Sequence, residues 1–461
     1  MAPRTRVGFV HVLFLSFLLT AGMACRQLGP FEARFAAPTP QSLQFLPQGT
    51  HPSATPTFSP TATTKAATIP RGWHSIEPLS QGPLRLHRLH MVDEHQGWAL
   101  GTVGNAGPRV LITDDGAHTW REVSPPSLPS TTNADLIQTL FWDANTAWIA
   151  YGYKATDPTQ IEPGVWVTHD RGTTWRWAPI PWPADIAMPH FRPGPLTAVD
   201  ENRAWMLVHL DAGMGQDYAL LVATTDGGGS WHILATPDSD EASDLMLMFT
   251  SGLAFAPDGR YGWATKEMGP LPAALVVVTQ DGGRSWRATP FSPLPPEAAE
   301  NEAFCSTRDP HLWAPGQGVM LALCLLQAHP EGYTVFVVPW KDGEPQARRL
   351  IDAPPAEDAQ LTFPTAKEGY LVVYTGASTN GEGTTLTQRS YLFTSNDGGS
   401  TWEPQRPLPW RGLFSWLPGG RGWALADDGH TVRLVRTTDQ GRSWEMLPQP
   451  RLILPAGGDG P

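Results

Sequence analysis

The sequence predicts an all-β protein, a seven-bladed β-propeller whose blades carry Asp-box turns. An eight-residue segment, Ser/Thr-x-Asp-x-Gly-x-Ser/Thr-Trp, recurs along almost the whole chain. Its aspartates are separated by 55, 56, 55, 116 and 42 residues, so the long interval holds one decayed copy. A second marker, an aromatic residue that opens a short apolar run, recurs every 50 to 58 residues. A fixed period of this size with several short strands per unit is typical of a propeller, in which no blade can bury its faces alone.

The repeated segment has the composition of a turn. Glycine supplies a positive φ, the aspartate accepts hydrogen bonds from loop N–H groups, and the tryptophan buries a large ring between strands. We therefore expect these residues to be structural and not catalytic. The box aspartates are Asp115, Asp170, Asp226, Asp281, Asp397 and Asp439. The box tryptophans are Trp120, Trp175, Trp231, Trp286, Trp402 and Trp444.

The first repeat predicts the strand order of a blade. Four strands are expected over residues 86–92, 97–102, 109–113 and 120–123, with the box between the last two. In the fifth repeat the decayed box is expected near Asp342. The aromatic marker also counts seven repeats, at Trp98, Trp148, Trp205, Trp263, Trp313, Tyr370 and Trp423.

Residues 1–25 predict export. Arg4 and Arg6 precede an apolar stretch, residues 7–19, that is too short for a comfortable membrane span and ends in small residues. Cys25 then stands where the lipobox of bacterial lipoproteins has its lipidated cysteine. We expect an N-terminal lipid that holds the protein to the bacterial membrane, outside the cytoplasm. Cleavage without lipid, and hence secretion, is one alternative, and an uncleaved anchor is the other.

The rest of the chain divides by composition. Residues 26–72 are rich in Pro, Thr and Ser and predict a disordered tether. The propeller is expected over residues 73–448, followed by a loose tail over residues 449–461. Trp73 opens a segment like the strands that follow each box. This suggests that the N-terminal strand closes the ring by pairing with the last blade, which would remove an exposed edge. Seven boxes already give seven outer strands, however, so which terminal strand closes the ring stays open.

Charge and cysteine content limit the possible partners. The formal net charge of −12 argues against non-specific nucleic-acid binding. Cys305 and Cys324 lie in the irregular fifth repeat, where a disulfide and two buried thiols are both open. No histidine or third cysteine stands at ligand spacing, so no metal site is predicted, and no cofactor. We expect a monomer.

The first repeat also resembles a known family. Residues 89–93 are followed by Gly97-Trp98-Ala99-Leu100-Gly101 and then by a box. This order resembles the propeller of the photosystem II stability and assembly factors, over residues 73–444. The resemblance implies a non-enzymatic scaffold. We therefore expect a non-catalytic binding or assembly module at the cell surface, with a protein or glycan partner.

An exported glycoside hydrolase of the sialidase-like type is the alternative, because sialidases also contain Asp-boxes. Such an enzyme needs three arginines, a Tyr/Glu nucleophile pair and an Asp acid/base. In sialidases, the motif with the first arginine usually lies before the first box. The only similar string here is residues 191–194, between the second and third boxes, so Arg192 is expected to be an ordinary loop residue. The tyrosines considered as nucleophiles are Tyr333, Tyr370, Tyr374 and Tyr391. The two functions are distinguished by whether one face gathers carboxylates with arginines or tyrosine.

Overall fold

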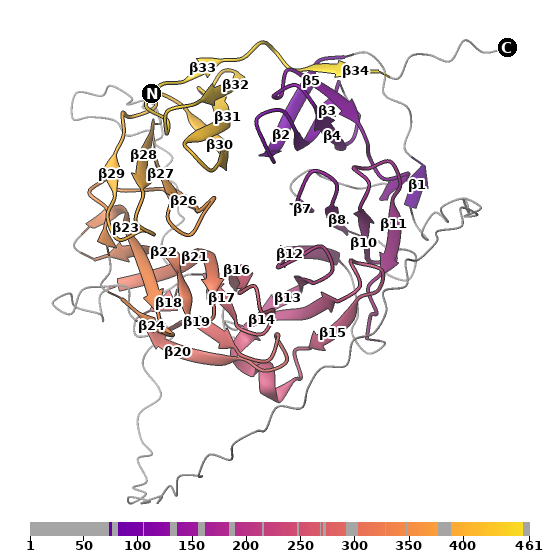
Figure 1. The fold of residues 1–461 in the computed structure, drawn as a ribbon. Helices are drawn as coiled ribbons and strands as arrows, with labels where there is room; N and C mark the ends of the chain where they lie inside the picture. Colours follow the sequence, from indigo (N-terminus) through magenta and orange to yellow (C-terminus); the bar gives the residue numbers. More distant parts are fainter. Residues whose placement is uncertain are drawn as a thin grey trace, which may run out of the picture. The chain divides into compact units, whose positions relative to one another are not determined.

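Seven antiparallel sheets surround a central axis in a computed structural model of the protein (Figure 1). The structure describes residues 73–75, 82–104, 106–129, 136–154, 162–183, 190–213, 216–246, 249–267, 269–270, 273–291, 303–327, 329–346, 349–376 and 389–454. The predicted seven-bladed propeller is confirmed. The predicted export segment, Cys25 and the tether all lie outside the described residues.

Each blade begins with a strand next to the axis, and the chain then moves outward. The innermost strands are β2 (Leu84–Met91), β7 (Ile137–Phe141), β12 (His190–Ala198), β16 (Thr250–Phe255), β21 (Ala303–Ala314), β26 (Asp358–Thr362) and β30 (Arg411–Leu417). The second strands are β3 (Gly97–Val103), β8 (Ala147–Tyr151), β13 (Ala204–Gly213), β17 (Gly262–Lys266), β22 (Gln317–Leu326), β27 (Gly369–Thr375) and β31 (Arg421–Asp427).

The chain continues outward through a third strand to a short fourth strand in each blade. The third strands are β4 (Arg109–Thr113), β10 (Gly164–Thr168), β14 (Gln216–Thr224), β19 (Ala273–Thr279), β23 (His329–Lys341), β28 (Arg389–Ser395) and β32 (Val432–Thr437). The fourth strands are β5 (Thr119–Glu122), β11 (Arg176–Pro179), β15 (His232–Ala235), β20 (Arg287–Phe291), β24 (Glu344–Pro345) with β25 (Arg349–Leu350), β29 (Glu403–Pro404) and β33 (Glu445–Met446). One 3₁₀ helix, η3 (Asp240–Met246), connects the third and fourth blades.

Two short strands cross from one blade to the next. β9 (Tyr153–Lys154) leaves the second blade and pairs with β12 of the third. β18 (Gly269–Pro270) leaves the fourth blade and pairs with β21 of the fifth. Both therefore add to the inner edge of a neighbouring sheet.

The ring is closed from its C-terminal end. β34 (Arg451–Ile453) pairs in parallel with β5 and becomes a fifth strand of the first blade. The predicted loose tail is therefore wrong for these residues, and so is closure by the N-terminal strand. β1 (Trp73–Ser75) pairs instead with β6 (Ser127–Pro129), in a separate two-stranded sheet. The physical reason is that β5 has a free edge, and the apolar Leu452 can pack against the cluster around Trp120.

Buried apolar side chains lie between the blades. Seven clusters fill the seven interfaces, and each contains residues of two neighbouring blades. In the described part of the chain, indole N–H groups strengthen three of these interfaces: Trp98 donates to the carbonyl of Asp143 (2.7 Å), Trp205 to Gly282 (3.0 Å) and Trp423 to Gly116 (3.3 Å). Each acceptor lies in the following blade. The apolar core thus holds the blades to one another.

The aromatic marker lies on the second strand in six of the seven blades. The exception is Trp313, which lies on β21, the innermost strand of the fifth blade. On the second strand of that blade, Val319 follows Gly318 as Trp263 follows Gly262 in the fourth blade. The marker position of the fifth blade therefore holds Val319, which packs in the cluster between the fifth and sixth blades.

Candidate functional site

The repeated eight-residue segments form turns between third and fourth strands. In the fourth blade, Asp281 accepts hydrogen bonds from the hydroxyls of Thr279 (2.9 Å) and Ser285 (2.6 Å) and from the N–H of Ser285 (2.9 Å). Gly282 and Gly283 have φ values of 79° and 96°. Burial alone would oppose ionisation, but these hydrogen bonds outweigh it and lower the pKa of Asp281.

The other five predicted aspartates have lowered pKa values for the same reasons, and that of Asp226 is about 2. Four of the predicted tryptophans, Trp120, Trp286, Trp402 and Trp444, donate to a carbonyl of their own turn. Trp175 donates to Val123 of the preceding blade at 2.7 Å, and Trp231 is buried in the core. The aspartates are thus satisfied within their own turns, and a carboxylate so held is a poor proton donor.

In the fifth blade Asp342 lies in a different turn. Asp342 and Gly343 have φ values of 55° and 80° and form a two-residue connection between β23 and β24. A two-residue loop with both φ values positive matches the twist of a hairpin. The decayed copy thus lies where a box is expected, but its backbone has the conformation of a two-residue hairpin loop.

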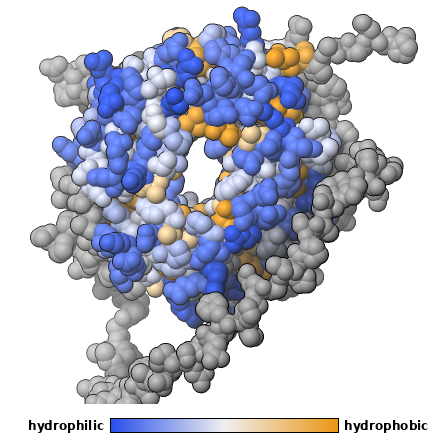
Figure 2. Space-filling model, in the orientation of Figure 1, coloured by the Kyte–Doolittle hydropathy of each residue, from blue (hydrophilic) through white to orange (hydrophobic). Residues whose placement is uncertain are grey.

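Register shifts occur in several strand pairs farther out in the blades, and four of the seven innermost strands are also bulged. The register shifts at His87 in β2, between Pro193 and Leu196 in β12, at Ser251 in β16, and between Arg308 and His311 in β21. Bulges redirect side chains and are over-represented beside active sites. Here they lie on strands that surround the central opening, whose visible rim combines hydrophilic and hydrophobic residues (Figure 2).

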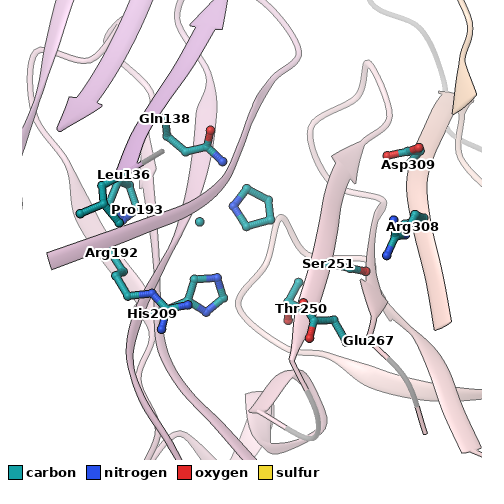
Figure 3. A pocket seen from close by; sticks show the side chains of 12 residues that line it. Leu136, Gln138, Arg192, Pro193, His209, Thr250, Ser251, Glu267, Arg308 and Asp309 are labelled. Atoms are coloured by element: carbon teal, nitrogen blue, oxygen red, sulfur yellow. The ribbon is translucent and has the colours of Figure 1, made fainter. Parts of the chain in front are cut away.

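The bulged residues line two adjoining cavities. The first, of about 480 Å³, is lined by residues of the second to fifth blades: Leu136, Gln138, Arg192, Pro193, Gly194, Pro195, His209, Thr250, Ser251, Glu267, Arg308 and Asp309 (Figure 3). The second, of about 680 Å³, is lined by residues of the fifth, sixth, seventh and first blades: Leu86, His87, Arg308, Asp309, Asp358, Ala359, Gln360, Tyr374, Arg411, Gly412, Leu413, Leu425, Asp427 and Val432. Arg308 and Asp309 belong to both.

Arg192 lies in the first cavity, and the prediction of an ordinary loop residue is wrong. It is on the innermost strand β12, directly before the bulge. Its guanidinium is exposed, and no ion pair joins it to another described residue. Across the cavity, Glu267 is likewise exposed and without an ion pair in the described part of the chain (Figure 3).

Asp309 combines a strained backbone with a half-buried side chain. Its φ is 47°, a left-handed value that is uncommon for a residue other than glycine. Its Oδ2 accepts a hydrogen bond from the N–H of Leu361 at 2.8 Å. Burial raises the pKa of Asp309 to about 6, although the Leu361 hydrogen bond and the charge of Arg308 act in the opposite direction. Strained and titration-shifted residues cluster at functional sites, so Asp309 is a candidate functional residue.

Arginines and carboxylates pair around the second cavity. Arg308 forms an ion pair with Asp358. Arg411 pairs with Glu357 at 2.9 Å, and its guanidinium lies 5.1 Å from the ring centre of Tyr374. Tyr374 donates to the carbonyl of Gly412 at 2.7 Å, and burial raises its pKa. The second cavity therefore gathers carboxylates, arginines and a tyrosine, which is the arrangement expected for the glycoside hydrolase alternative.

The other predicted tyrosines do not line these cavities. Tyr370 donates to the carboxylate of Glu368, and Glu368 also accepts the N–H groups of Gly419 and Gly420 of the next blade. This Tyr/Glu pair thus connects the sixth and seventh blades. Tyr333 and Tyr391 pack against the cluster between the fifth and sixth blades.

Sequence reasoning missed Asp309 and Glu267. A signal for the first was present: Asp309 precedes Pro310 inside a strand, and Pro193 and Pro195 interrupt β12 in the same way. Proline within a strand marks an edge or a bulge. Glu267 carries no comparable signal, because it follows an apolar strand like many other polar residues.

The remaining predicted sites lie elsewhere. Cys305 and Cys324 face each other on β21 and β22 and form a disulfide. Within the described ranges, no group of three or more His, Cys, Asp or Glu residues could hold a metal ion. Among the residues that the structure describes, no helix has the length and apolarity needed to cross a membrane.

The chain was compared with known proteins. No protein-family model matches it, and no curated protein does. Among solved structures it is similar to a GH74 xyloglucanase from Xanthomonas campestris, with 14% identity, a TM-score of 0.49, and coverage of 83% of this chain and 56% of the other. A structure from a study of two prolyl endopeptidases has 13% identity and a TM-score of 0.44, with coverage of 79% of this chain and 49% of the other. A PL25 ulvan lyase has 10% identity and a TM-score of 0.42, with coverage of 80% of this chain and 95% of the other.

The chain therefore spans about half the length of the first two of these structures. Similarity at this level of identity concerns the propeller fold alone. The site has to be interpreted from its own residues.

Proposed function

We propose that the protein is a non-catalytic binding propeller outside the cytoplasm and that it takes its ligand in the cavities at the channel. The observation that carries this proposal is the set of four bulged inner strands whose residues surround two adjoining cavities. The propeller fold by itself needs only regular inner strands, and each bulge costs ladder hydrogen bonds. Four bulges that aim polar groups into shared space are best explained by a ligand.

The proposed context comes from the chain's own motifs. The repeated turns have the residues and hydrogen bonds that we assign to Asp-boxes, and the order of strand and box resembles the photosystem II assembly factors. We extend only the scaffold role of that family to this chain. The lipid proposed at Cys25 would hold the propeller at the membrane surface, where its partner is a membrane-associated protein or glycan. Incorporation of labelled fatty acid into the wild-type chain, and not into Cys25→Ser, tests the anchor.

A capture experiment tests the binding role. Full-length protein is used to retain partners from solubilised membranes, beside Arg192→Gln, Asp309→Asn and the control Arg406→Gln. Arg406 is exposed and lies outside both cavities, so its variant loses the same charge as Arg192→Gln without touching the site. The wild type and the control are expected to retain the same partner, and the two cavity variants to lose most of it. Equal retention by all four would contradict a binding site at the channel.

Glycoside hydrolysis is the second candidate, and Asp309 favours it. A glycosidase uses one protonated carboxyl as the acid and one carboxylate as the base or nucleophile. Asp309, with its raised pKa, and Glu267 lie on the same cavity. Turnover of a chromogenic glycoside that survives repurification and is abolished in Asp309→Asn and Glu267→Gln would establish this activity in place of the binding role.

A further inference from the structure

Charged side chains are distributed unevenly between the two sides of the first cavity. Arg192 and Gln138 lie on the side of the second and third blades, and Glu267 and Asp309 on the side of the fourth and fifth (Figure 3). The side with Arg192 therefore offers hydrogen-bond donors and positive charge. The opposite side offers these two carboxyl groups together with Arg308, whose charge is paired with Asp358.

The donors on the first side are aimed and available. Arg88 donates to the carbonyl of Ile137 (2.7 Å) and to Oε1 of Gln138 (3.3 Å), which leaves the amide NH₂ of Gln138 as the group free to donate. The guanidinium of Arg192 is exposed at the cavity. Arg308 is different, because its ion pair with Asp358 already uses its charge.

Gly194 makes room for the ring of His209 beside Arg192. A Cβ at this position would lie 2.5 Å from Nε2 of His209. The histidine ring therefore lies directly over the backbone of the bulge and forms part of the cavity wall there. A planar carboxylate can approach the exposed guanidinium of Arg192 edge-on and accept two parallel hydrogen bonds.

Arg192 and Glu267, which form no ion pair within the described residues, restrict the class of ligand. A neutral ligand that filled the cavity would desolvate Arg192 and Glu267 without neutralising either, which is costly. An anion would satisfy Arg192 and be repelled by Glu267, and a cation would have the reverse effect. A ligand with both charges satisfies both sides.

We propose that this cavity binds a small zwitterion, a free amino acid or a short peptide with both ends unblocked. Its carboxylate lies against Arg192 and the amide of Gln138, and its ammonium group lies between Glu267 and Asp309. The inference rests on the proposed function, because it names the ligand class of the same site. A volume of about 480 Å³ accommodates a ligand of this size.

Binding of an ammonium group is expected to release a proton. Asp309 is partly protonated near neutral pH, and a positive charge beside it favours its ionised form. The charged groups that face Asp309 are Arg308 and Asp358, and Arg192, Glu267 and His209 line the same cavity. Proton release distinguishes this pose from one in which the ligand lies away from Asp309.

The test is titration calorimetry of the full-length protein with each of the twenty amino acids and with alanyl-alanine. For the best ligand, the N-acetyl and C-terminal amide derivatives are expected to bind at least about tenfold more weakly, because each removes a charge-assisted hydrogen bond. Arg192→Gln and Glu267→Gln are each expected to show the same loss. Arg406→Gln and Glu403→Gln, at exposed positions away from the cavity, are the matched controls and are expected to bind like the wild type. Titration in buffers of different ionisation enthalpy should show proton release near pH 6.5, and none in Asp309→Asn.

Galacturonate and glucose separate the possible failures. If galacturonate binds through Arg192 and no zwitterion does, the zwitterion proposal is overturned and the binding site stands. If none of these ligands binds, the zwitterion proposal is also overturned. The proposed function fails with it only if Arg192→Gln retains membrane partners as the wild type does. Blocked derivatives that bind as tightly as the free zwitterion would overturn the charge assignment.

Discussion

The carboxylate of Asp309 accepts the backbone N–H of Leu361 at 2.8 Å, and the two residues belong to neighbouring blades. The bond crosses the interface at the channel, where β21 is bulged and Asp309 has a φ of 47°. A neutral apolar side chain could not make this bond, and a carboxylate makes it at the cost of burying charge. The ionised side chain of Asp309 therefore lowers the stability of the folded protein, as is common for functional residues.

The first prediction is that Asp309→Asn stabilises the protein at high pH. Its pKa is raised from 3.8 to about 6 on folding, so the folded state binds more protons between these values and stability falls as the pH rises through that window. Above pH 6, the free energy of unfolding of the wild type should thus be up to about 3 kcal/mol lower than it would be with a neutral side chain at this position. Asparagine tolerates the left-handed conformation and can still accept the Leu361 N–H.

Urea unfolding of both proteins at pH 8 and pH 3.5 checks this prediction. The variant is expected to be more stable at pH 8 by about 1–3 kcal/mol, with a difference near zero at pH 3.5. A variant that is less stable at pH 8 would show that the ionised carboxylate contributes to folding.

A second prediction concerns Trp205, which stacks on Phe255 with ring centres 4.0 Å apart and donates to Gly282 of the next blade. Trp205→Phe keeps most of the ring and loses the hydrogen bond, for an expected cost of about 1–2 kcal/mol. Trp205→Ala also leaves a cavity, for about 3–5 kcal/mol. Denaturant midpoints measure both. Trp142, 37% exposed, is the control, and its alanine variant should change stability by less than about 0.5 kcal/mol.

The third prediction concerns ring closure by β34. Removal of residues 450–461 uncovers the edge of β5 and the face on which Leu452 packs, so we expect a loss of about 2–3 kcal/mol and faster aggregation on heating. Removal of residues 455–461 alone is the control. Light scattering and thermal unfolding compare the two, and equal behaviour would mean that β34 contributes nothing to closure.

The fourth prediction concerns the Cys305–Cys324 disulfide, which spans 19 residues of sequence. Loop-closure entropy gives it a stabilising effect of about 3 kcal/mol. The paired variant Cys305→Ala with Cys324→Ala should be less stable by about that amount. Reductant should lower the melting temperature of the wild type and leave that of the variant unchanged. An effect of reductant on both would point to a different cause.

The fifth prediction is acid sensitivity of the repeated turns. Since the pKa of Asp226 falls from 3.8 to about 2 on folding, its contribution is complete above about pH 4 and is lost as the pH falls toward 2. Asp226→Asn should cost about 1 kcal/mol at pH 7 and progressively less below pH 4. Asp238→Asn, at an exposed position with no such turn, is the control. A constant difference across this pH range would exclude the ionised hydrogen bonds as the cause.

The repeats predicted most of the fold, because period, turn residues and buried aromatics all follow from local chemistry. The first blade has its four strands within two residues of the predicted positions. Closure was not predictable in this way, since residues 449–461 contain too few apolar positions to show a strand, and the partner β5 is distant in sequence. Arg192 was misplaced for a related reason. Its loop-like Pro-Gly-Pro neighbours produce a bulge inside a strand, and only the ring places that strand at the axis.

Ring closure also determines when the protein can fold. Trp423 and Gly116, which meet at the interface of the last and first blades, are 307 residues apart. Contacts of such high sequence separation form late and slowly, because a long chain loses much entropy before they are made. The earlier blades can form during synthesis, but the first blade waits for its fifth strand until the C-terminal residues emerge. A chain exported as the sequence predicts would therefore complete its first blade only after β34 has crossed the membrane.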